Sequence, residues 1–362
     1  MKSILVYYNN MNAPGGIERV ISNLLKEWVK EYRVILLTKN GVMDTYYRIP
    51  KEVKRYSLNN PLVLNMNSRT QRVFATALNM MSSIHQLRRF LKKIKTDYIY
   101  TATPVNSLEI YLASSPIENK LIISEHASAF AVNWLYQIVK RFLYPKAYCI
   151  CVPNKMDVSV YKKWGCRTLY IPHIVTFSCQ KMNTLDTKIA INVGRYTSDK
   201  RQDLLIRAWA EIKDKKGWKL WIIGEGEEEV NLRKLVNDLN VCDSVFLKPA
   251  SKDIVNIYQQ ASLFLFTSRM EGFGMVLLEA MSFGIPCISF NCPSGPEDVI
   301  CHNYNGFLAE NGNKEDFVCK IQSYFDMNLQ TRRLLGINAR KTVEKWDTEK
   351  IMKRWRKIYC EN

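Results

Sequence analysis

TSRMEGFGMVLLEAMSFGIPCISF, residues 267–290, contains the end of a strand, a loop, a helix and a second strand, in that order. The apolar run ASLFLFTS that leads into it is typical of a buried strand, and Gly272 and Gly274 mark the loop. The apolar helix that follows has its predicted end at Gly284, before the strand IPCISF. A strand, a helix and a strand in succession are the repeating unit of a parallel sheet, so this stretch predicts an α/β fold.

The same alternation extends through both halves of the chain. It predicts two doubly wound, Rossmann-like sheets with helices on both faces. Further strands are expected at 3–8, 32–38, 97–103, 120–126, 147–153, 168–172, 189–196, 218–226 and 244–249. Helices are expected at 17–31, 66–95, 134–148, 201–214, 227–240, 253–260 and 347–359.

This pattern divides the chain into four segments. Residues 1–175 form the predicted N-terminal domain, and 176–188 are a weakly patterned linker. Residues 189–345 form the second domain, and 346–362 form a terminal helix that we expect to pack back on the N-terminal domain.

Composition indicates a cytoplasmic globular protein. The 362 residues are 47% hydrophobic, which is enough for two cores. No uncharged apolar run reaches the ~18 residues of a spanning helix, and the N-terminus loses its apolar character too early for a signal peptide. The ten cysteines and four histidines form no paired zinc pattern, so we expect reduced, mostly buried cysteines and no metal.

The net charge of +18 is unevenly distributed. Residues 1–175 contain 25 Lys and Arg against 10 Asp and Glu, whereas the remainder contains 27 against 24. Such a basic half indicates an anionic membrane surface, nucleic acid or an anionic substrate. The predicted helix at 66–95 carries much of this charge, although a solvated cationic face on a core helix accounts for it as readily. The helix at 134–148 interleaves aromatic and basic residues, as either an interfacial or a packed helix does.

Ligands of open parallel sheets bind at the carboxyl ends of the strands, where loops lead into helix N-termini that attract phosphate. Gly15 and Gly16 precede the first predicted helix and let backbone amides approach an anion, although a glycine pair there is often only a turn. His126 lies at the carboxyl end of a predicted strand, a position that supports a site role, although a lone histidine is more often structural.

Arg195 and Lys200 lie in GRYTSDKRQD, the segment between the apolar strand run IAINV and a predicted helix. Because Arg195 directly follows a buried strand, we expect its cation to need an anionic partner. A diphosphate fits, since arginine supplies a bidentate fork and lysine a mobile point charge. The alternative is a surface salt bridge to Asp199 or Glu225.

Two glutamates lie eight positions apart in the stretch at 267–290. Glu271 opens the glycine loop, and Glu279 lies about two turns into an apolar helix. A buried carboxylate has to be paired or hydrogen-bonded, for which sugar or ribose hydroxyls are suitable donors and internal arginines the alternative. The turn at Ser294 and Gly295 offers amides to one edge of a ligand, or is only a turn.

Taken together in chain order, the segments described above resemble the retaining glycosyltransferases of family four, which have the GT-B fold. The resemblance covers nearly the whole chain through GGIERV, EHAS, VGRYTSDKRQDLLI, WIIGEGEE, EGFGMVLLEAMSFGIPCI and NGFL. The glutamates at 271 and 279 are specific in that context. The resemblance implies two Rossmann-like domains facing a central cleft, a nucleotide-sugar donor, and neither a metal nor another cofactor.

The resemblance also implies roles for the candidate residues. His126 and Glu271 would lie at the reaction centre, with Glu271 touching the donor hexose. The expected donor-binding residues are Gly15, Gly16, Arg195, Lys200, Phe273, Gly274 and Glu279, the last at the ribose. The loop RYTSDKRQD departs slightly from the family pattern, which leaves either Lys200 or Arg201 as the phosphate ligand.

CPSGPEDVI, residues 292–300, is most similar to a subgroup that uses UDP-galactose, UDP-N-acetylgalactosamine or UDP-glucose in bacterial polysaccharide or lipid-linked oligosaccharide assembly. The resemblance therefore implies α-retaining transfer, by front-face attack, to a polyprenyl-diphosphate-linked glycan. It also implies peripheral association with the anionic cytoplasmic face of the membrane. In similar enzymes a basic helix engages the lipid diphosphate, so Arg69, Arg72 and Arg88 are the acceptor-binding candidates here.

Three other functions stay open. A sugar-nucleotide epimerase on a related two-domain fold is the nearest, and a catalytically silent membrane scaffold is the second. The third is a nucleic-acid-binding protein. The basic residues are spread over several predicted faces and no known binding module is present, so we expect no nucleic-acid partner.

Overall fold

The computed structural model describes residues 1–41, 44–61, 69–114, 120–130, 134–175, 181–251 and 253–360, without the side chains of 69–74 and 134–135. The chain divides into two compact units. The first contains Met1–Ile174 and Ile351–Asn362, and the second contains Val175–Lys350. Two parts of the predictions, 66–68 in the basic helix and 176–180 in the linker, lie outside the described residues.

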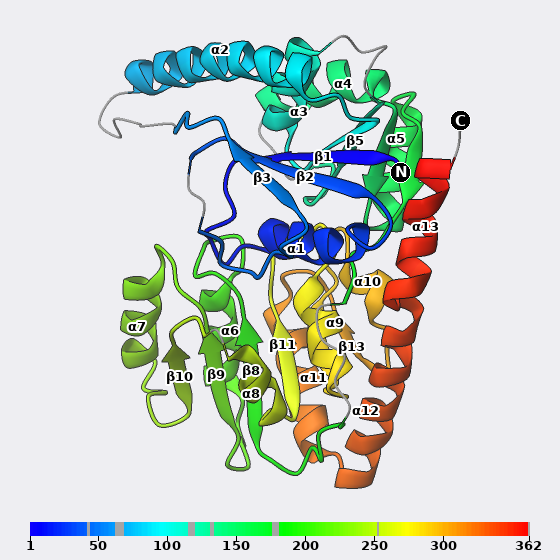
Figure 1. Cartoon of the computed structure of the whole chain (residues 1–362). Helices are drawn as coiled ribbons and strands as arrows, with labels where there is room; N and C mark the ends of the chain where they lie inside the picture. The colour runs from blue at the N-terminus through cyan, green and yellow to red at the C-terminus, as the bar shows by residue number, and fades with distance from the viewer. Residues whose placement is uncertain are drawn as a thin grey trace. The chain divides into compact units, whose positions relative to one another are not determined.

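The first unit contains a sheet of seven parallel strands in the order β3-β2-β1-β4-β5-β6-β7 (Figure 1). The chain adds β2 and β3 on one side of β1 and then returns to its other side with β4, so the strand order reverses there. The strands are β1 (Ser3–Tyr8), β2 (Arg33–Thr38), β3 (Lys54–Ser57), β4 (Tyr98–Thr101), β5 (Lys120–Ser124), β6 (Cys149–Val152) and β7 (Thr168–Tyr170).

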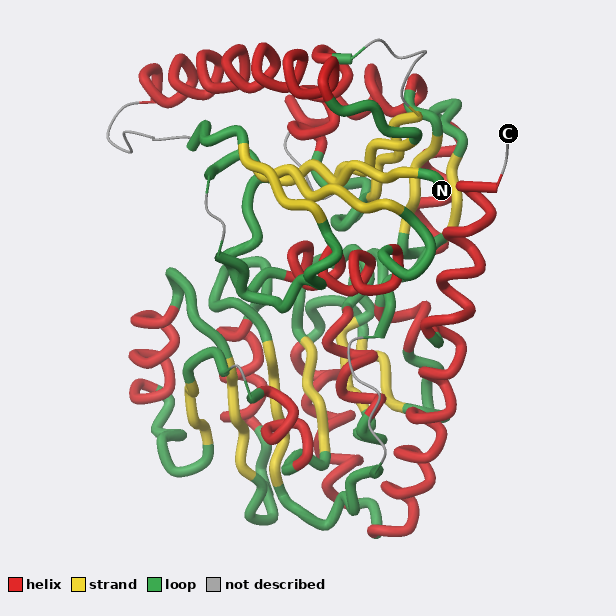
Figure 2. Tube along the Cα trace, viewed as in Figure 1, coloured by secondary structure: helices red, strands yellow, loops and turns green. Residues whose placement is uncertain are grey.

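Helices cover both faces of this sheet (Figure 2). Alternate strand residues such as Leu5 and Tyr7 share a core with Leu87. On the other face Trp28 packs edge-to-face on Trp355, with ring centroids 5.2 Å apart. The helices are α1 (Gly16–Trp28), α2 (Arg69–Lys93), α3 (Pro104–Ala113), α4 (Trp134–Leu143), α5 (Lys155–Lys163) and α13 (Thr348–Cys360), with a 3₁₀ turn at Tyr144–Lys146.

The second unit contains six parallel strands in the order β10-β9-β8-β11-β12-β13. Here the order reverses between β8 and β11. The strands are β8 (Ile189–Val193), β9 (Lys219–Ile223), β10 (Val245–Lys248), β11 (Leu263–Phe266), β12 (Cys287–Phe290) and β13 (Gly306–Ala309). The helices are α6 (Gln202–Glu211), α7 (Glu229–Asp238), α8 (Ile254–Gln259), α9 (Met275–Ser282), α10 (Pro296–Val299), α11 (Lys314–Asp326) and α12 (Leu329–Val343), with a 3₁₀ turn at Glu344–Trp346.

The α/β fold with two Rossmann-like sheets is confirmed, and every predicted strand is present. The prediction omitted β3, β13, α3, α5, α10, α11 and α12. Residues 181–187 of the expected linker pack on the second unit, where Asn183 Nδ2 donates to the carbonyls of Tyr258 and Ala261 at 2.7 Å each. The terminal helix contacts the first unit through Trp355 and Tyr359.

Candidate functional site

The carboxyl ends of β8 and β11 lie next to each other where the second sheet reverses its strand order. The loop after β8 carries Lys200, and the loop after β11 carries Glu271. Lys200 Nζ lies 2.6 Å from Glu271 Oε1, and both side chains keep partial solvent exposure, 23% and 14%. The structure thus brings together two predicted site residues that are 71 positions apart in the sequence.

Two further contacts join these loops. The backbone amide of Arg269 donates to the carbonyl of Asp199 at 2.8 Å, and Thr267 Oγ1 donates to the carbonyl of Lys200 at 2.9 Å. Burial lowers the pKa of Lys200, but the Glu271 carboxylate more than offsets this, so the pKa lies above its ordinary value. Lys200 is therefore a charged ammonium that Glu271 holds in place at the carboxyl ends of the strands.

Arg195 is exposed, so the expectation that it is a buried cation in need of a partner is wrong. Strand β8 ends at Val193, two residues before Arg195. Among the described residues the Arg195 guanidinium has neither a hydrogen bond nor an ion pair, and its carbonyl accepts from Gln202 Nε2 at 2.9 Å. Arg201, the other candidate phosphate ligand, donates to Asn311 Oδ1 at 3.2 Å.

Helix α9 starts at this site. Its N-cap, Gly274, has φ +78°, a left-handed conformation that favours glycine. Gly295, in the loop after β12, has φ +115°, and a Cβ there would lie 2.8 Å from the carbonyl oxygen of Phe273. Phe273 is buried and packs against Trp346 with ring centroids 6.1 Å apart. The lack of a side chain at Gly295 thus lets the loop after β12 approach the Phe273 backbone, next to the N-terminus of α9.

Glu279 lies inside α9 and is fully buried, as the apolar pattern predicts. Tyr258 OH donates to Glu279 Oε2 at 3.0 Å. The protein itself supplies this hydrogen bond, so burial of the carboxylate does not by itself require a ribose hydroxyl. This donor is a tyrosine, which neither of the two alternatives had named.

In the first unit, Gly15 is the N-cap of α1 and Gly16 its first residue. The Glu18 carboxylate lies directly over Gly15 and accepts a hydrogen bond from Tyr8 OH at 3.2 Å. This N-terminus therefore already has an internal acidic neighbour, which the spacing of the glycines did not predict.

His126 follows β5, at the carboxyl edge of the first sheet. Its ring stacks on His173 with centroids 4.9 Å apart and an interplanar angle of 15°, and its Nε2 lies 3.3 Å from Tyr100 OH. Burial lowers the pKa of His126 to about 4, although the nearby Glu125 carboxylate opposes the shift. The imidazole is therefore neutral at pH 7.

A buried ionic cluster lies behind His126. Glu125 Oε2 is 2.6 Å from Lys140 Nζ and accepts from Tyr144 OH at 3.0 Å and from Tyr161 OH at 2.7 Å. Glu125 Oε1 accepts from the backbone amide of His126 at 3.3 Å. Burial and the adjacent carboxylate raise the pKa of both tyrosines, so they remain neutral donors. The cluster connects the His126 loop to α4 and α5.

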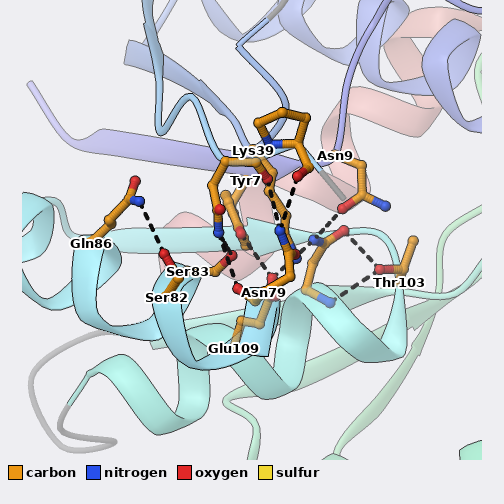
Figure 3. Close-up of polar contacts among 12 residues, drawn as sticks. Tyr7, Asn9, Lys39, Asn79, Ser82, Ser83, Gln86, Thr103 and Glu109 are labelled. Carbon is orange, nitrogen blue, oxygen red and sulfur yellow. Dashed lines mark hydrogen bonds and ion pairs between the residues drawn. The ribbon is translucent and has the colours of Figure 1, made fainter. Parts of the chain in front are cut away.

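A second buried pair was not predicted. Lys39, which follows β2, lies 2.6 Å from Glu109 of α3, and Tyr7 OH donates to the same carboxylate at 2.8 Å (Figure 3). Asn9 Oδ1 accepts from Asn106 Nδ2 at 2.9 Å beside them. A carboxylate in the apolar helix SLEIYLA is the same signal that identified Glu279, so Glu109 was detectable from sequence as a buried acid.

The three acceptor-binding candidates lie on α2. The side chains of Arg69 and Arg72 lie outside the described residues. Arg88 donates to the carbonyl of Leu112 at 2.9 Å and borders a cavity at the amino edge of the first sheet. The structure therefore does not bring Arg88 together with His126, which lies at the opposite edge.

Two other properties bear on the site. Across the described ranges, no group of three or more His, Cys, Asp or Glu side chains has a geometry that could hold a metal ion. No helix within the same ranges is long and apolar enough to cross a membrane.

Two family models match the two halves of the chain separately. Residues 14–175 match the family model described as Glycosyltransferase Family 4, and residues 179–342 match the one described as Glycosyl transferases group 1. An uncharacterized glycosyltransferase of Haemophilus influenzae is 26% identical over 367 residues, which cover 99% of this chain and 100% of the relative.

A Campylobacter jejuni relative is named as an alpha-1,4-N-acetyl-D-galactosaminyltransferase of GalNAc-alpha-(1->4)-GalNAc-alpha-(1->3)-diNAcBac-PP-undecaprenol. It is 24% identical over 358 residues, which cover 96% of this chain and 95% of the relative. A crystal structure of an S. aureus TarM mutant with fondaparinux, alpha-GlcNAc-glycerol and UDP has a TM-score of 0.83 at 16% identity and covers all of both chains. Together with the two parallel sheets, these matches show that the chain belongs to the family-four glycosyltransferases with the GT-B fold.

Proposed function

We propose that this glycosyltransferase transfers a hexose or N-acetylhexosamine from a UDP-sugar to a lipid-linked glycan, with retention of the α configuration. Galactose, N-acetylgalactosamine and glucose are the favoured sugars, and assembly of a bacterial surface polysaccharide such as capsule or O-antigen is the favoured setting. The observation that carries this proposal is the Lys200–Glu271 pair at the strand-order reversal of the second sheet. Ligands of doubly wound sheets bind at that position.

The charges around this pair suit departure of a diphosphate. When the bond from the sugar to the UDP oxygen breaks, negative charge grows on the leaving phosphate. Lys200 supplies a fixed ammonium, the exposed Arg195 supplies a bidentate guanidinium, and the N-terminus of α9 adds its dipole. We propose that these groups stabilise the leaving group without a metal ion, while the acceptor hydroxyl attacks from the same face.

Glu271 has two roles in this proposal. It holds Lys200 in place in the absence of donor, and it accepts a hydroxyl of the donor hexose when the diphosphate engages Lys200. Glu279 then holds the ribose only if Tyr258 shares or releases its carboxylate. Neutral His126 lies at the edge of the first sheet, where it can contact the transferred sugar without carrying charge.

The names of the relatives support the donor and acceptor classes. The Campylobacter jejuni protein is named for a diphosphate-undecaprenol acceptor, and the TarM structure contains UDP. The basic first half of the chain agrees with an anionic acceptor and with peripheral association at the cytoplasmic face of a membrane.

The decisive experiment measures UDP release from a panel of UDP-sugars, with and without a polyprenyl-diphosphate glycan, in buffer with and without EDTA. We expect acceptor-dependent release that EDTA leaves unchanged, and NMR of the product should show an α linkage. Lys200→Met should abolish most of the release, whereas Lys213→Met, an exposed lysine of the same unit, should not. Conversion of the UDP-sugar without an acceptor would identify an epimerase instead.

A further inference from the structure

A large cationic cavity lies at the amino edge of the first sheet. Its volume is about 1570 Å³, and the first residues of several strands line it, among them Ser3, Arg33, Lys54 and Lys120. At about 3.3 Å per residue, the five or six residues of β1, β2 and β5 place this edge roughly 15–20 Å from the carboxyl edge that carries His126. The cavity is therefore separate from the candidate site of this unit.

Positive charge dominates the cavity. Its charged lining consists of Lys2, Arg33, Lys54, Arg88, Lys92, Lys95, Lys120, Glu52 and Asp97. The Asp97 carboxylate is already engaged, because it accepts from the backbone amide and the hydroxyl of Ser3 at 2.7 Å each. In the part of the chain that the structure describes, the ammonium groups of Lys54, Lys92 and Lys95 have no ion pair or hydrogen bond. A phosphate-bearing ligand would reduce the repulsion among these lysines.

The outer face of α2 continues this surface. Leu78 and Met81 are 50% and 66% exposed, although both are large apolar side chains. His85, Arg89 and Lys92 follow at steps of four, four and three residues, so all five side chains lie on one face of the helix. Lys92 belongs both to this face and to the cavity lining. One continuous surface therefore combines apolar side chains with unpaired cations, as membrane-surface helices do.

The neighbouring helices add to the apolar part of this surface. In Figure 1, α3 and α4 lie on the same side of the first sheet as α2, and α3 contacts both of the others. Leu112 of α3 is 40% exposed, and Ile138 and Phe142 of α4 are 54% and 53% exposed. A soluble phosphate compound would use only the charges, whereas a lipid surface uses both the charges and the apolar side chains.

We propose that the cavity and the outer face of α2 bind the headgroups of anionic phospholipids. Lys54, Lys92 and Lys95 contact the phosphates, and Leu78 and Met81 enter the boundary between headgroups and acyl chains. The inference specifies the surface for the membrane association in the proposed function and rests on that association, not on the donor chemistry.

The first test is sedimentation of the full chain with vesicles of phosphatidylcholine alone or mixed with phosphatidylglycerol. We expect binding only to the mixed vesicles. Each lysine near an anionic surface contributes about fivefold to partitioning, so the triple variant Lys54→Glu, Lys92→Glu and Lys95→Glu should weaken binding by at least about a hundredfold.

The matched control has the same change in net charge. Lys213→Glu, Lys234→Glu and Lys345→Glu alter three exposed lysines of the second unit and should change binding no more than about twofold, because screened charges outside the contact act weakly. An equal loss in both triple variants would overturn the proposal, since net charge alone would then explain it.

The second test concerns the apolar part. Leu78→Ser with Met81→Ser should weaken vesicle binding about tenfold, whereas Leu334→Ser with Ile337→Ser, which are 59% and 53% exposed on α12, should leave it unchanged. Competition by inorganic pyrophosphate that removes all binding would show a soluble-phosphate site and overturn the proposal. UDP binding in solution should be unchanged in all four variants, so a failure here is distinct from a failure of the proposed function.

Discussion

The buried pair of Glu125 and Lys140 allows a quantitative test of how the His126 loop is held. Lys140→Met keeps the length of the side chain but leaves the Glu125 carboxylate without its cation. The two side chains are 4% and 0% exposed, so water cannot replace the lost charge. Removal of one partner from a buried pair costs about 3–5 kcal/mol. Tyr144 and Tyr161 still donate to the carboxylate, which places the expected cost near the lower end, about 3 kcal/mol.

Urea unfolding followed by circular dichroism measures this cost. With a slope of about 2 kcal/mol per molar, the midpoint of the affected transition should fall by about 1.5 M. The double variant Lys140→Met with Glu125→Gln should recover most of the loss, because it removes the unpaired charge. Lys30→Met, which breaks the exposed pair with Glu27 in the same unit, should cost no more than about 0.5 kcal/mol. A cost below about 1 kcal/mol for Lys140→Met, or a double variant no more stable than the single one, would refute the reasoning.

Four further outcomes are expected. Lys200→Met removes the ammonium that faces Glu271 and should reduce UDP-sugar turnover by about 10²–10³-fold, measured by UDP release; an unchanged rate would remove Lys200 from the mechanism. His126 has a pKa of about 4 in the folded state, below that of the unfolded chain, so the unfolded state binds more protons and stability should fall as the pH drops from about 6.5 to 4. His126→Gln should flatten that part of the urea-midpoint profile. Gly274→Ala forces a Cβ into a left-handed conformation and should cost about 1–3 kcal/mol in thermal unfolding; a stabilised variant would contradict the geometry. Trp355→Ala leaves a cavity at a buried site on α13 and should destabilise the first unit by about 3–5 kcal/mol, measured by urea unfolding. An unchanged unfolding midpoint would contradict this prediction.

The sheets were predictable because buried parallel strands leave continuous apolar runs. Segments such as 3–8 and 120–126 have no other reading once helices alternate with them. Helices α3, α5, α11 and α12 were omitted even though Thr103, Asn154, Asn313 and Asn328 cap them with side-chain hydrogen bonds. These caps were visible in the sequence as helix-start signals.

The candidate site was predictable only in part. The sequence places Lys200 and Glu271 in loops after strands, but only the strand order shows that the two loops are neighbours. Arg195 was misjudged because the residue at which a strand ends determines whether the next cation is buried, and apolar runs define that end only to within a few residues. A buried carboxylate can be inferred from its apolar neighbours, whereas its partner cannot, as Tyr258 for Glu279 and Lys39 for Glu109 show.

The return of α13 to the first unit has a consequence for synthesis on the ribosome. Trp355 and Tyr359 fill the face of the first sheet beside Trp28, and Lys2 Nζ donates to the carbonyl of Tyr359. The second unit is continuous in sequence, so it can fold before the chain is finished, whereas the first unit lacks part of its core until the last helix emerges. The apolar face of the first sheet beside Trp28 therefore stays uncovered until α13 has been synthesised, long after the rest of that unit.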